Sequence, residues 1–164
     1  DIKISPVELK DSEKNFIMDL KKYYEKNRYV FDNKELYLLR NLGRGRGIGF
    51  FQAHNFYPDF IMWQVEGKRQ NITFIDPHGM RHHLDQLGNP KVMFHKEVKV
   101  LEQQIGDKDV RLESFIISAT EHSKLVLEGV KISREEYEKN NVVFQDTQGQ
   151  YIEKIFKTVS GERT

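Results

Sequence analysis

The sequence predicts an α/β (α+β) domain in which helices flank a central mixed β-sheet. Segments with helical spacing of apolar residues alternate with short runs rich in β-branched and aromatic residues, roughly in the order helix, three strands, helix, strand. That order is typical of a mixed sheet covered by helices. The length of 164 residues fits a single domain over 1–164, and 38% apolar residues are enough to bury its core.

The first segment, residues 5–27, is predicted to be an amphipathic helix because apolar side chains recur at three- and four-residue spacing, and Ser12 is a plausible N-cap. A turn at residues 31–34 separates it from residues 35–41, which favour a short strand over the end of a helix. The apolar residues of the helix are Phe16, Ile17, Leu20, Tyr23 and Tyr24.

Residues 42–49 hold four of the eleven glycines, with Arg44 and Arg46 between them. Such a loop can bring backbone and guanidinium groups close to a phosphate, although it can equally be a solvated loop. It matches neither the P-loop pattern nor GxGxxG, so nucleotide binding is not supported. A strand at residues 48–54 is expected to follow.

The chain is organised around residues 56–81, which predict two neighbouring strands, 57–65 and 71–76, joined by a polar turn. Asp59 lies near the start of the first strand and Asp76 ends the second. Carboxylates at one end of adjacent strands place two hard oxygen ligands a few Å apart, as a Mg²⁺ site requires.

The motif Asp76-Pro77-His78 closes the second strand. Side chains two residues apart on a strand point to the same face. If the strand pairing continues through Pro77, Asp76 and His78 therefore share a face.

The rest of the chain alternates helices with strands after an irregular stretch at 80–90. Gly106 is expected to end one of these helices, and Ser133 with Glu136 forms a capping box at the start of another. We expect helices at 91–106, 133–140 and 151–159, and strands at 111–119 and 142–144.

Composition excludes several classes of protein. The absence of cysteine rules out a disulfide scaffold, a thiolate metal site and a cysteine nucleophile. No run approaches the roughly 18 to 20 apolar residues of a membrane span. The 26 basic and 25 acidic residues nearly balance, so the overall charge does not indicate nucleic acid or any other kind of partner. Because the first residue is not Met, we expect a processed chain or a fragment of a larger protein.

Pro58-Asp59 opening one strand and Asp76-Pro77-His78 closing the next resemble the PD-(D/E)xK nuclease superfamily. More narrowly, residues 38–79 resemble nuclease domains attached to bacterial superfamily-2 helicases and type III restriction-type subunits. The resemblance implies a restriction-endonuclease-like fold, Mg²⁺- or Mn²⁺-dependent cleavage of DNA, a helicase or translocase partner, and a bacterial, cytoplasmic setting with a role in restriction or phage defence.

Residue by residue, the resemblance implies that Asp59 and Asp76 bind the metal and that the carbonyl of Pro77 adds a ligand. The departure is His78, which stands where the motif has Lys. A histidine near its ordinary pKa of about 6.5 can exchange a proton but is cationic only when protonated. His78 is therefore expected to act as general base or to orient the water, with Arg44 or Arg46 touching the DNA backbone.

A further acid often comes from the first helix of this superfamily. Glu13, Glu25 and Glu35 are candidates, and we favour Glu35 because it lies closest before the strands.

Other interpretations stay open. Asp59 and Asp76 each adjoin a proline and can be ordinary turn residues, in an unrelated α+β protein. His78, His82 and His83 suggest a zinc site only weakly, without cysteine or an HExxH frame. The departure at His78 also allows a catalytically silent module that binds DNA or a partner protein.

Overall fold

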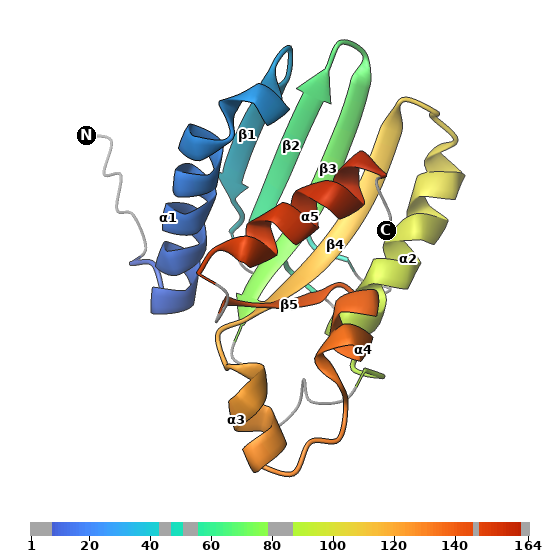
Figure 1. The fold of residues 1–164 in the computed structure, drawn as a ribbon. Helices are drawn as coiled ribbons and strands as arrows, with labels where there is room; N and C mark the ends of the chain where they lie inside the picture. Colours follow the sequence, from blue (N-terminus) through green and yellow to red (C-terminus); the bar gives the residue numbers. More distant parts are fainter. Residues whose placement is uncertain (1–7, 43–46, 51–55, 79–86, 146–147, 162–164) are drawn as a thin grey trace, which may run out of the picture.

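The computed structural model describes residues 8–42, 47–50, 56–78, 87–145 and 148–161. Its centre is a five-stranded mixed sheet with the strands in sequence order (Figure 1). The first three strands form an antiparallel meander, and the last two run parallel to the third. The strands are β1 (Glu35–Arg40), β2 (Phe60–Glu66), β3 (Arg69–His78), β4 (Val110–Ser118) and β5 (Val142–Phe144).

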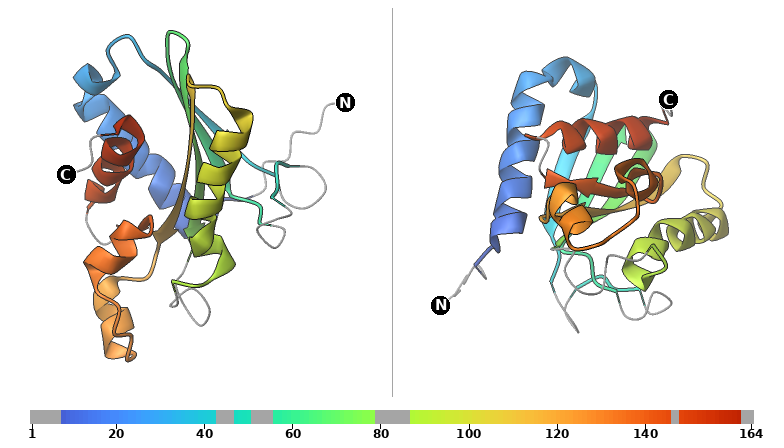
Figure 2. Two further views of the ribbon diagram at one scale, coloured as in Figure 1. Left: turned by 90° about the vertical axis from the view of Figure 1, so that its right-hand side faces the viewer. Right: turned by 60° about the horizontal axis from the view of Figure 1, so that its bottom comes forward.

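Helices cover both faces of the sheet, so the predicted α/β class is confirmed. Seen edge-on, α1 and α5 lie on one face and α2 on the other (Figure 2). None of the helices in the described part of the chain combines the length and apolar character needed to cross a bilayer. The helices are α1 (Asp11–Lys26), η1 (Arg28–Phe31), α2 (Pro90–Ile105), α3 (His122–Leu127), α4 (Arg134–Lys139) and α5 (Gln150–Ser160).

Two apolar clusters, one on each face, hold these layers together. Alternate residues of a strand point to opposite faces, so Phe74 packs with Phe94 of α2 while its neighbour Ile75 packs with Phe16 of α1. The phenyl rings of Phe16 and Phe60 lie 5.4 Å apart. The sheet is thus buried on both sides at β3, which explains its long apolar run.

The start of α1 is tied to the end of β3. Lys10 occupies the N-cap position without a side-chain hydrogen bond to the helix, so the prediction of Ser12 as the cap is wrong. The Ser12 hydroxyl instead donates to the carbonyl of Pro77 at 3.2 Å. This bond fixes the first turn of α1 beside the predicted metal-binding motif.

The strands β2 and β3 are joined by a two-residue turn, with Glu66 opposite Arg69 and Gly67 at φ 60°. β3 extends to His78, paired with Ser118 of β4, so Asp76 and His78 share a face as predicted. Pro77 has no amide hydrogen, but β3 loses no strand-to-strand hydrogen bond there. The carbonyl of His78 accepts a bond from the residue that follows β4, so the backbone of Pro77 faces the side of β2. β2 begins at Phe60, opposite Ile75, so Pro77 lies beyond its end.

The later helices and strands follow the sequence prediction closely. The Asn89 side chain accepts a bond from the Lys91 amide at 3.0 Å, and Gly106 ends α2 in the left-handed conformation. The Ser133 hydroxyl accepts from the Glu136 amide at 3.1 Å, which confirms the predicted cap of α4. Helix α3 was not predicted.

Two expected segments fall wholly or partly outside the described residues. Of the strand expected at 48–54, residues 51–54 lie outside, and Phe50 pairs with Phe56 as an isolated antiparallel bridge. Of the irregular stretch at 80–90, residues 80–86 lie outside.

We expect Phe16→Ala to lower the free energy of unfolding by about 3 to 5 kcal/mol, because a fully buried phenyl ring leaves a cavity between α1 and the sheet. Urea denaturation measures the change. Met18→Ala on the same helix, where the side chain is 47% exposed, is the matched control and is expected to stay within about 0.5 kcal/mol. Equal effects of the two changes would contradict this account of how α1 packs.

Candidate functional site

Two carboxylates meet at one end of the antiparallel pair β2 and β3. Phe60 pairs with Ile75, so Asp59, one residue before β2, comes opposite Asp76 on the neighbouring strand. Residues directly opposite on an antiparallel pair point to the same face. Asp76 is only 2% exposed. The structure therefore brings together the two aspartates that the sequence singles out.

This arrangement is electrostatically costly for the chain alone. Burial, the negative charge of Asp76 and a hydrogen bond with Asp76 together raise the pKa of Asp59 from 3.8 to about 7, with burial as the largest cause. Lys10 lowers the pKa of Asp59 and Glu13 raises it slightly. A second positive charge at the carboxylate pair would relieve the repulsion.

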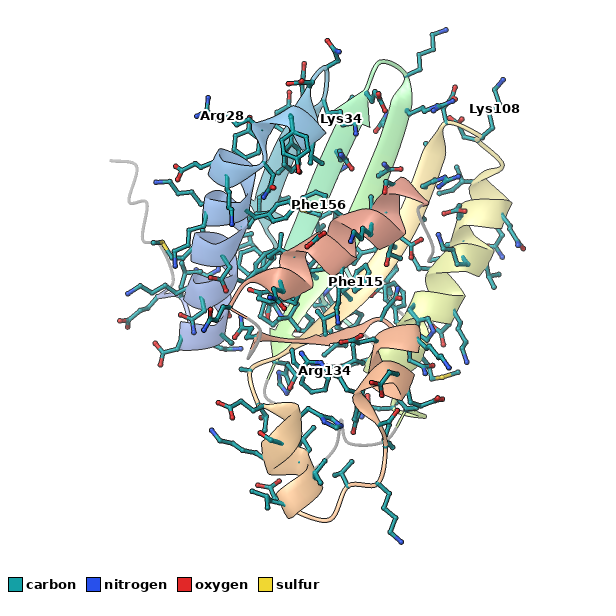
Figure 3. All side chains as sticks on the ribbon, viewed as in Figure 1. Arg28, Lys34, Lys108, Phe115, Arg134 and Phe156 are labelled. Carbon is teal, nitrogen blue, oxygen red and sulfur yellow. The ribbon has the colours of Figure 1, made fainter. Side chains whose placement is uncertain are left out.

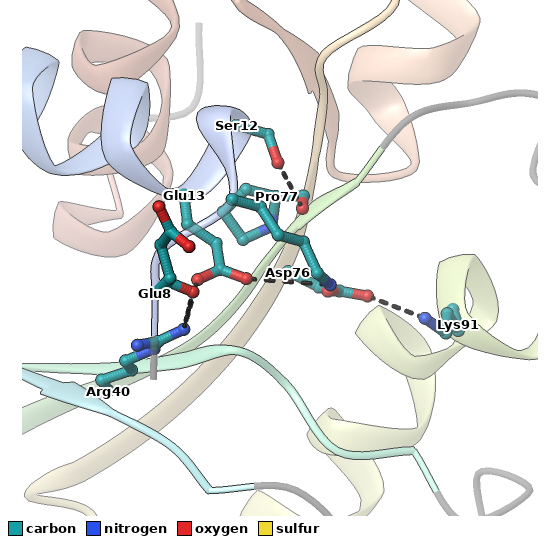
Figure 4. Close-up of polar contacts among 8 residues, drawn as sticks. Glu8, Ser12, Glu13, Arg40, Asp76, Pro77 and Lys91 are labelled. Atoms are coloured by element: carbon teal, nitrogen blue, oxygen red, sulfur yellow. Dashed lines mark hydrogen bonds and ion pairs between the residues drawn. The ribbon is translucent and has the colours of Figure 1, made fainter. Parts of the chain in front are cut away.

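Lys91 from α2 supplies one positive charge to the pair. Its ammonium nitrogen lies 3.1 Å from Oδ2 of Asp76 (Figure 4). The same nitrogen lies 5.6 Å from the centre of the Phe56 ring. The capped start of α2 at Asn89 places it there. Sequence reasoning missed this residue. One signal was available, because a cation in the first turn of a helix opposes the helix dipole and needs another reason to be there.

The acid contributed by the first helix is Glu13. Its side chain is buried, and it accepts a hydrogen bond from Arg40 at 2.9 Å, with Lys10 at 3.7 Å (Figure 4). Arg40 also donates to the carbonyl of Glu8 at 3.2 Å. Glu13 thus reaches the carboxylate end of the sheet already paired with cations.

The choice of Glu35 as the additional acid is wrong in its placement. Glu35 begins β1 opposite Val65, whereas Arg40, at the other end of β1, lies opposite Phe60 beside the aspartates. Five residues of strand separate the two ends by roughly 17 Å. Glu25 lies near the opposite end of α1 from Glu13.

Pro77 and His78 complete the motif. The Pro77 carbonyl accepts the bond from Ser12 and keeps a second lone pair. His78 is half-buried, and burial lowers its pKa, an effect that Asp76 opposes and that Lys91 and Lys10 reinforce. Its imidazole is therefore mainly neutral at pH 7, able to accept a proton but not to act as a fixed cation.

Mg²⁺ suits this donor set. Among the residues that the structure describes, no three Asp, Glu or His side chains are grouped closely enough to hold a metal. Mg²⁺ keeps several waters and is commonly bound by only one or two carboxylates together with substrate phosphates. Asp59 and Asp76 are two acids, and Lys91 is bonded to only one of them. A hard divalent cation would therefore fit between the two carboxylates.

Several sequence candidates cannot be placed. Arg44 and Arg46 of the glycine-rich loop lie outside the described residues, as do His82 and His83 of the zinc interpretation. The half-buried His95 lies on α2, where its ring bonds the Val92 carbonyl at 2.6 Å.

Comparison with protein-family models, with curated proteins and with solved structures finds no match for this chain. The function is therefore argued from the geometry of the site.

We expect Asp59→Asn to stabilise the protein at pH 8 but not at pH 5. Between pH 3.8 and about 7 the folded state holds a proton on Asp59 that the unfolded state has lost. The free energy of unfolding therefore falls as pH rises through this range, and the full destabilisation by Asp59 is reached above pH 7. Thermal melting without divalent metal measures the effect, at about 2 to 4 °C per kcal/mol.

Asp32→Asn, at an exposed turn residue, is the matched control for this pH dependence. A melting temperature for Asp59→Asn that stays below that of the wild type at both pH values would contradict the repulsion between Asp59 and Asp76.

Proposed function

We propose that this chain is a metal-dependent nuclease domain that hydrolyses phosphodiester bonds in DNA, with Asp59 and Asp76 binding Mg²⁺ or Mn²⁺. The observation that carries the proposal is the placement of two carboxylates opposite each other on β2 and β3, with Lys91 beside them. Like charges held together under burial do not stabilise a fold. Such clusters occur preferentially where a protein binds cations or performs chemistry.

The metal and the chain divide the chemistry. When bound, Mg²⁺ supplies Lewis-acid charge to the scissile phosphate and to the oxygens whose negative charge grows during the reaction. Asp59 and Asp76 would hold the ion, with the free lone pair of the Pro77 carbonyl as a further donor. The Ser12 bond to that carbonyl keeps it in place.

Lys91 is the best candidate for the fixed positive charge that the lysine of the PD-(D/E)xK motif would provide. Burial keeps His78 mainly neutral, so His78 does not replace that charge. Lys91 approaches Asp76 from α2, and its side chain is 38% exposed. An ammonium group that is partly open to solvent at this position can also contact an incoming phosphate.

His78 is proposed as the proton acceptor. It shares the face of β3 with Asp76, and a neutral imidazole can take a proton from an attacking water. In this assignment the two tasks of the motif lysine are divided between His78 and Lys91.

DNA would be bound mainly through its phosphates. Among the residues described, the cations next to the carboxylates include Lys10, Lys91 and Arg40, all of which are partly or largely exposed. Contacts of this kind carry no sequence information and weaken as salt rises. Targeting would then come from a helicase or translocase module in the same or an associated chain.

The second candidate is a nuclease-like module that binds DNA or a partner without cutting. Two observations favour it: His78 stands where the motif has Lys, and Lys91 already neutralises one oxygen of Asp76. If that ion pair never opens to a metal, the site is structural.

The first test of the proposal is cleavage of plasmid and single-stranded DNA in Mg²⁺ or Mn²⁺ by the wild type, Asp59→Asn and Asp76→Asn. We expect each variant to lose activity by roughly 10²-fold or more, because one of two metal-binding carboxylates is gone. We also expect Mg²⁺ to raise the melting temperature of the wild type but not of the variants.

Asp32→Asn is expected to behave like the wild type in both measurements. Two outcomes would end the enzyme proposal. One is equal nicking by all four proteins, which indicates a contaminant. The other is a wild type that shows neither cleavage nor an effect of Mg²⁺ on its melting temperature. Binding of DNA without cleavage or a Mg²⁺ effect would favour the silent module.

The division of roles predicts different losses at two positions. Lys91→Gln is expected to lower the cleavage rate by roughly 10²-fold, with partial rescue by Lys91→Arg, which keeps the charge. His78→Ala is expected to lower the rate by roughly 10²- to 10⁴-fold, as loss of a general base does.

Each change has a matched control on α2. Lys96→Gln alters an exposed lysine on the same helix as Lys91, and His95→Ala alters a half-buried histidine whose pKa burial also lowers. Melting curves check that Lys91→Gln folds, since it leaves Asp76 without its ion-pair partner. A His78→Ala protein that cuts DNA at the wild-type rate would remove His78 from the mechanism.

A further inference from the structure

A polar cavity lies at the end of the sheet opposite the carboxylates, with a volume of about 530 Å³. Its floor is a row of side chains on three neighbouring strands, because Gln64 pairs with Asn71 and Asn71 is in register with Arg111. The row belongs to the face of the sheet that α5 covers, and α5 ends beside it at Ser160.

Four cations surround this cavity, namely Lys34, Arg69, Lys108 and Arg111, against the two acids Glu66 and Asp109. Figure 3 places Lys34 and Lys108 at this end of the sheet. Within the described part of the chain, none of the four cationic side chains has an ion pair or a hydrogen bond. The lining residues that the structure describes thus carry a net charge of +2.

A larger cavity, about 730 Å³, is also lined with lysines but differs in this respect. There Lys99 lies 2.6 Å from Glu113, and Lys154 pairs with Glu138. Three of its five lysines, Lys99, Lys154 and Lys157, pair with an acid. None of the four cations of the 530 Å³ cavity does so within the described part of the chain.

Gln64 lies at the inner end of the 530 Å³ cavity and is only 5% exposed, and its Oε1 is fully buried without a hydrogen-bond partner. An unsatisfied buried acceptor destabilises a protein. A ligand therefore gains affinity if the Gln64 amide turns its Oε1 toward a donor group of that ligand. The carboxyl end of α5 adds a partial negative charge at Ser160 and Gly161. An anion therefore fits the outer rim, near Arg69 and Lys108, better than the inner end.

We propose that this cavity binds a small phosphate monoester that carries hydrogen-bond donors at its other end, of the class of nucleoside monophosphates. The phosphate, with a charge near −2, would lie between Arg69, Lys108 and Arg111, whose guanidinium groups suit bidentate contacts to phosphate. Donors on the sugar or base would face Gln64, and Asn71 offers both a donor and an acceptor. The volume is within the range of small-molecule sites.

This site is separate from the candidate nuclease centre. Asn71 and Asp76 are five residues apart on β3, roughly 17 Å along the strand, and their side chains point to opposite faces. The proposal therefore does not rest on DNA cleavage, and binding is expected to survive in Asp59→Asn.

Isothermal titration of the full chain with the adenosine, guanosine, cytidine and uridine monophosphates, and with inorganic phosphate, tests the proposal. We expect at least one nucleoside monophosphate to bind roughly 10-fold more tightly than inorganic phosphate. Arg69→Gln and Arg111→Gln are each expected to weaken that ligand roughly 10-fold. Gln64→Met, which keeps the side-chain size, is expected to remove the advantage over inorganic phosphate.

Lys131→Gln, an exposed lysine between α3 and α4, is the control for net charge and is expected to leave binding unchanged. Melting curves establish that the variants are folded, and Arg69 is exposed enough for its loss to leave the fold intact. The absence of binding at millimolar ligand would overturn the proposal. Equal affinity for inorganic phosphate and all four nucleotides, or affinity that Arg69→Gln does not change, would do so too.

Discussion

The repulsion between Asp59 and Asp76 is the constraint around which this end of the molecule is arranged. The two carboxylates are opposite each other on adjacent strands, and one is almost fully buried. Burial and the neighbouring charge together push the pKa of Asp59 to about 7. Positive groups arrive from other elements, with Lys91 from α2 and Lys10 from the start of α1.

The fold allows this because β3 is the strand at which the sheet changes from antiparallel to parallel. β2 begins at Phe60, so the last residues of β3 continue beyond it and are paired only with β4. The edge left open at Pro77 is where α1 attaches through Ser12, and α2 covers the other face. Helices on opposite faces of the sheet thus both contact this end of β3. Ser12 of α1 and Lys91 of α2, which are distant in sequence, therefore meet the same motif.

Sequence reasoning succeeds where the relevant physics is local. The alternation of apolar residues, the turn at Gly67 and the caps at Ser133 and Gly106 each depend on a few neighbouring residues, and the sheet, most helices and the meeting of Asp59 with Asp76 follow from them. Helix α3 has too short an apolar pattern to be recognised.

It fails where tertiary packing decides. Nothing local distinguishes Glu13 from Glu35. Only the docking of α1 through Phe16 brings Glu13 to Arg40, and only the direction of β1 carries Glu35 to the far end of the sheet. Lys91 was missed for the same reason, since its distance from Asp76 depends on how α2 packs against the sheet.

The pairing of Lys91 with Asp76 does not by itself explain why the chain carries two aspartates here. A buried ion pair is seldom more stable than well-packed neutral groups of similar volume, and breaking one by removing a partner is costly. If the pair served stability alone, Asp59 would be superfluous, because it adds a second negative charge next to an acid that already has its partner. In the proposed function, a cation of charge two would satisfy Asp59 and Asp76 together. Under the proposed function, the second aspartate is therefore the feature that separates this site from an ordinary structural salt bridge.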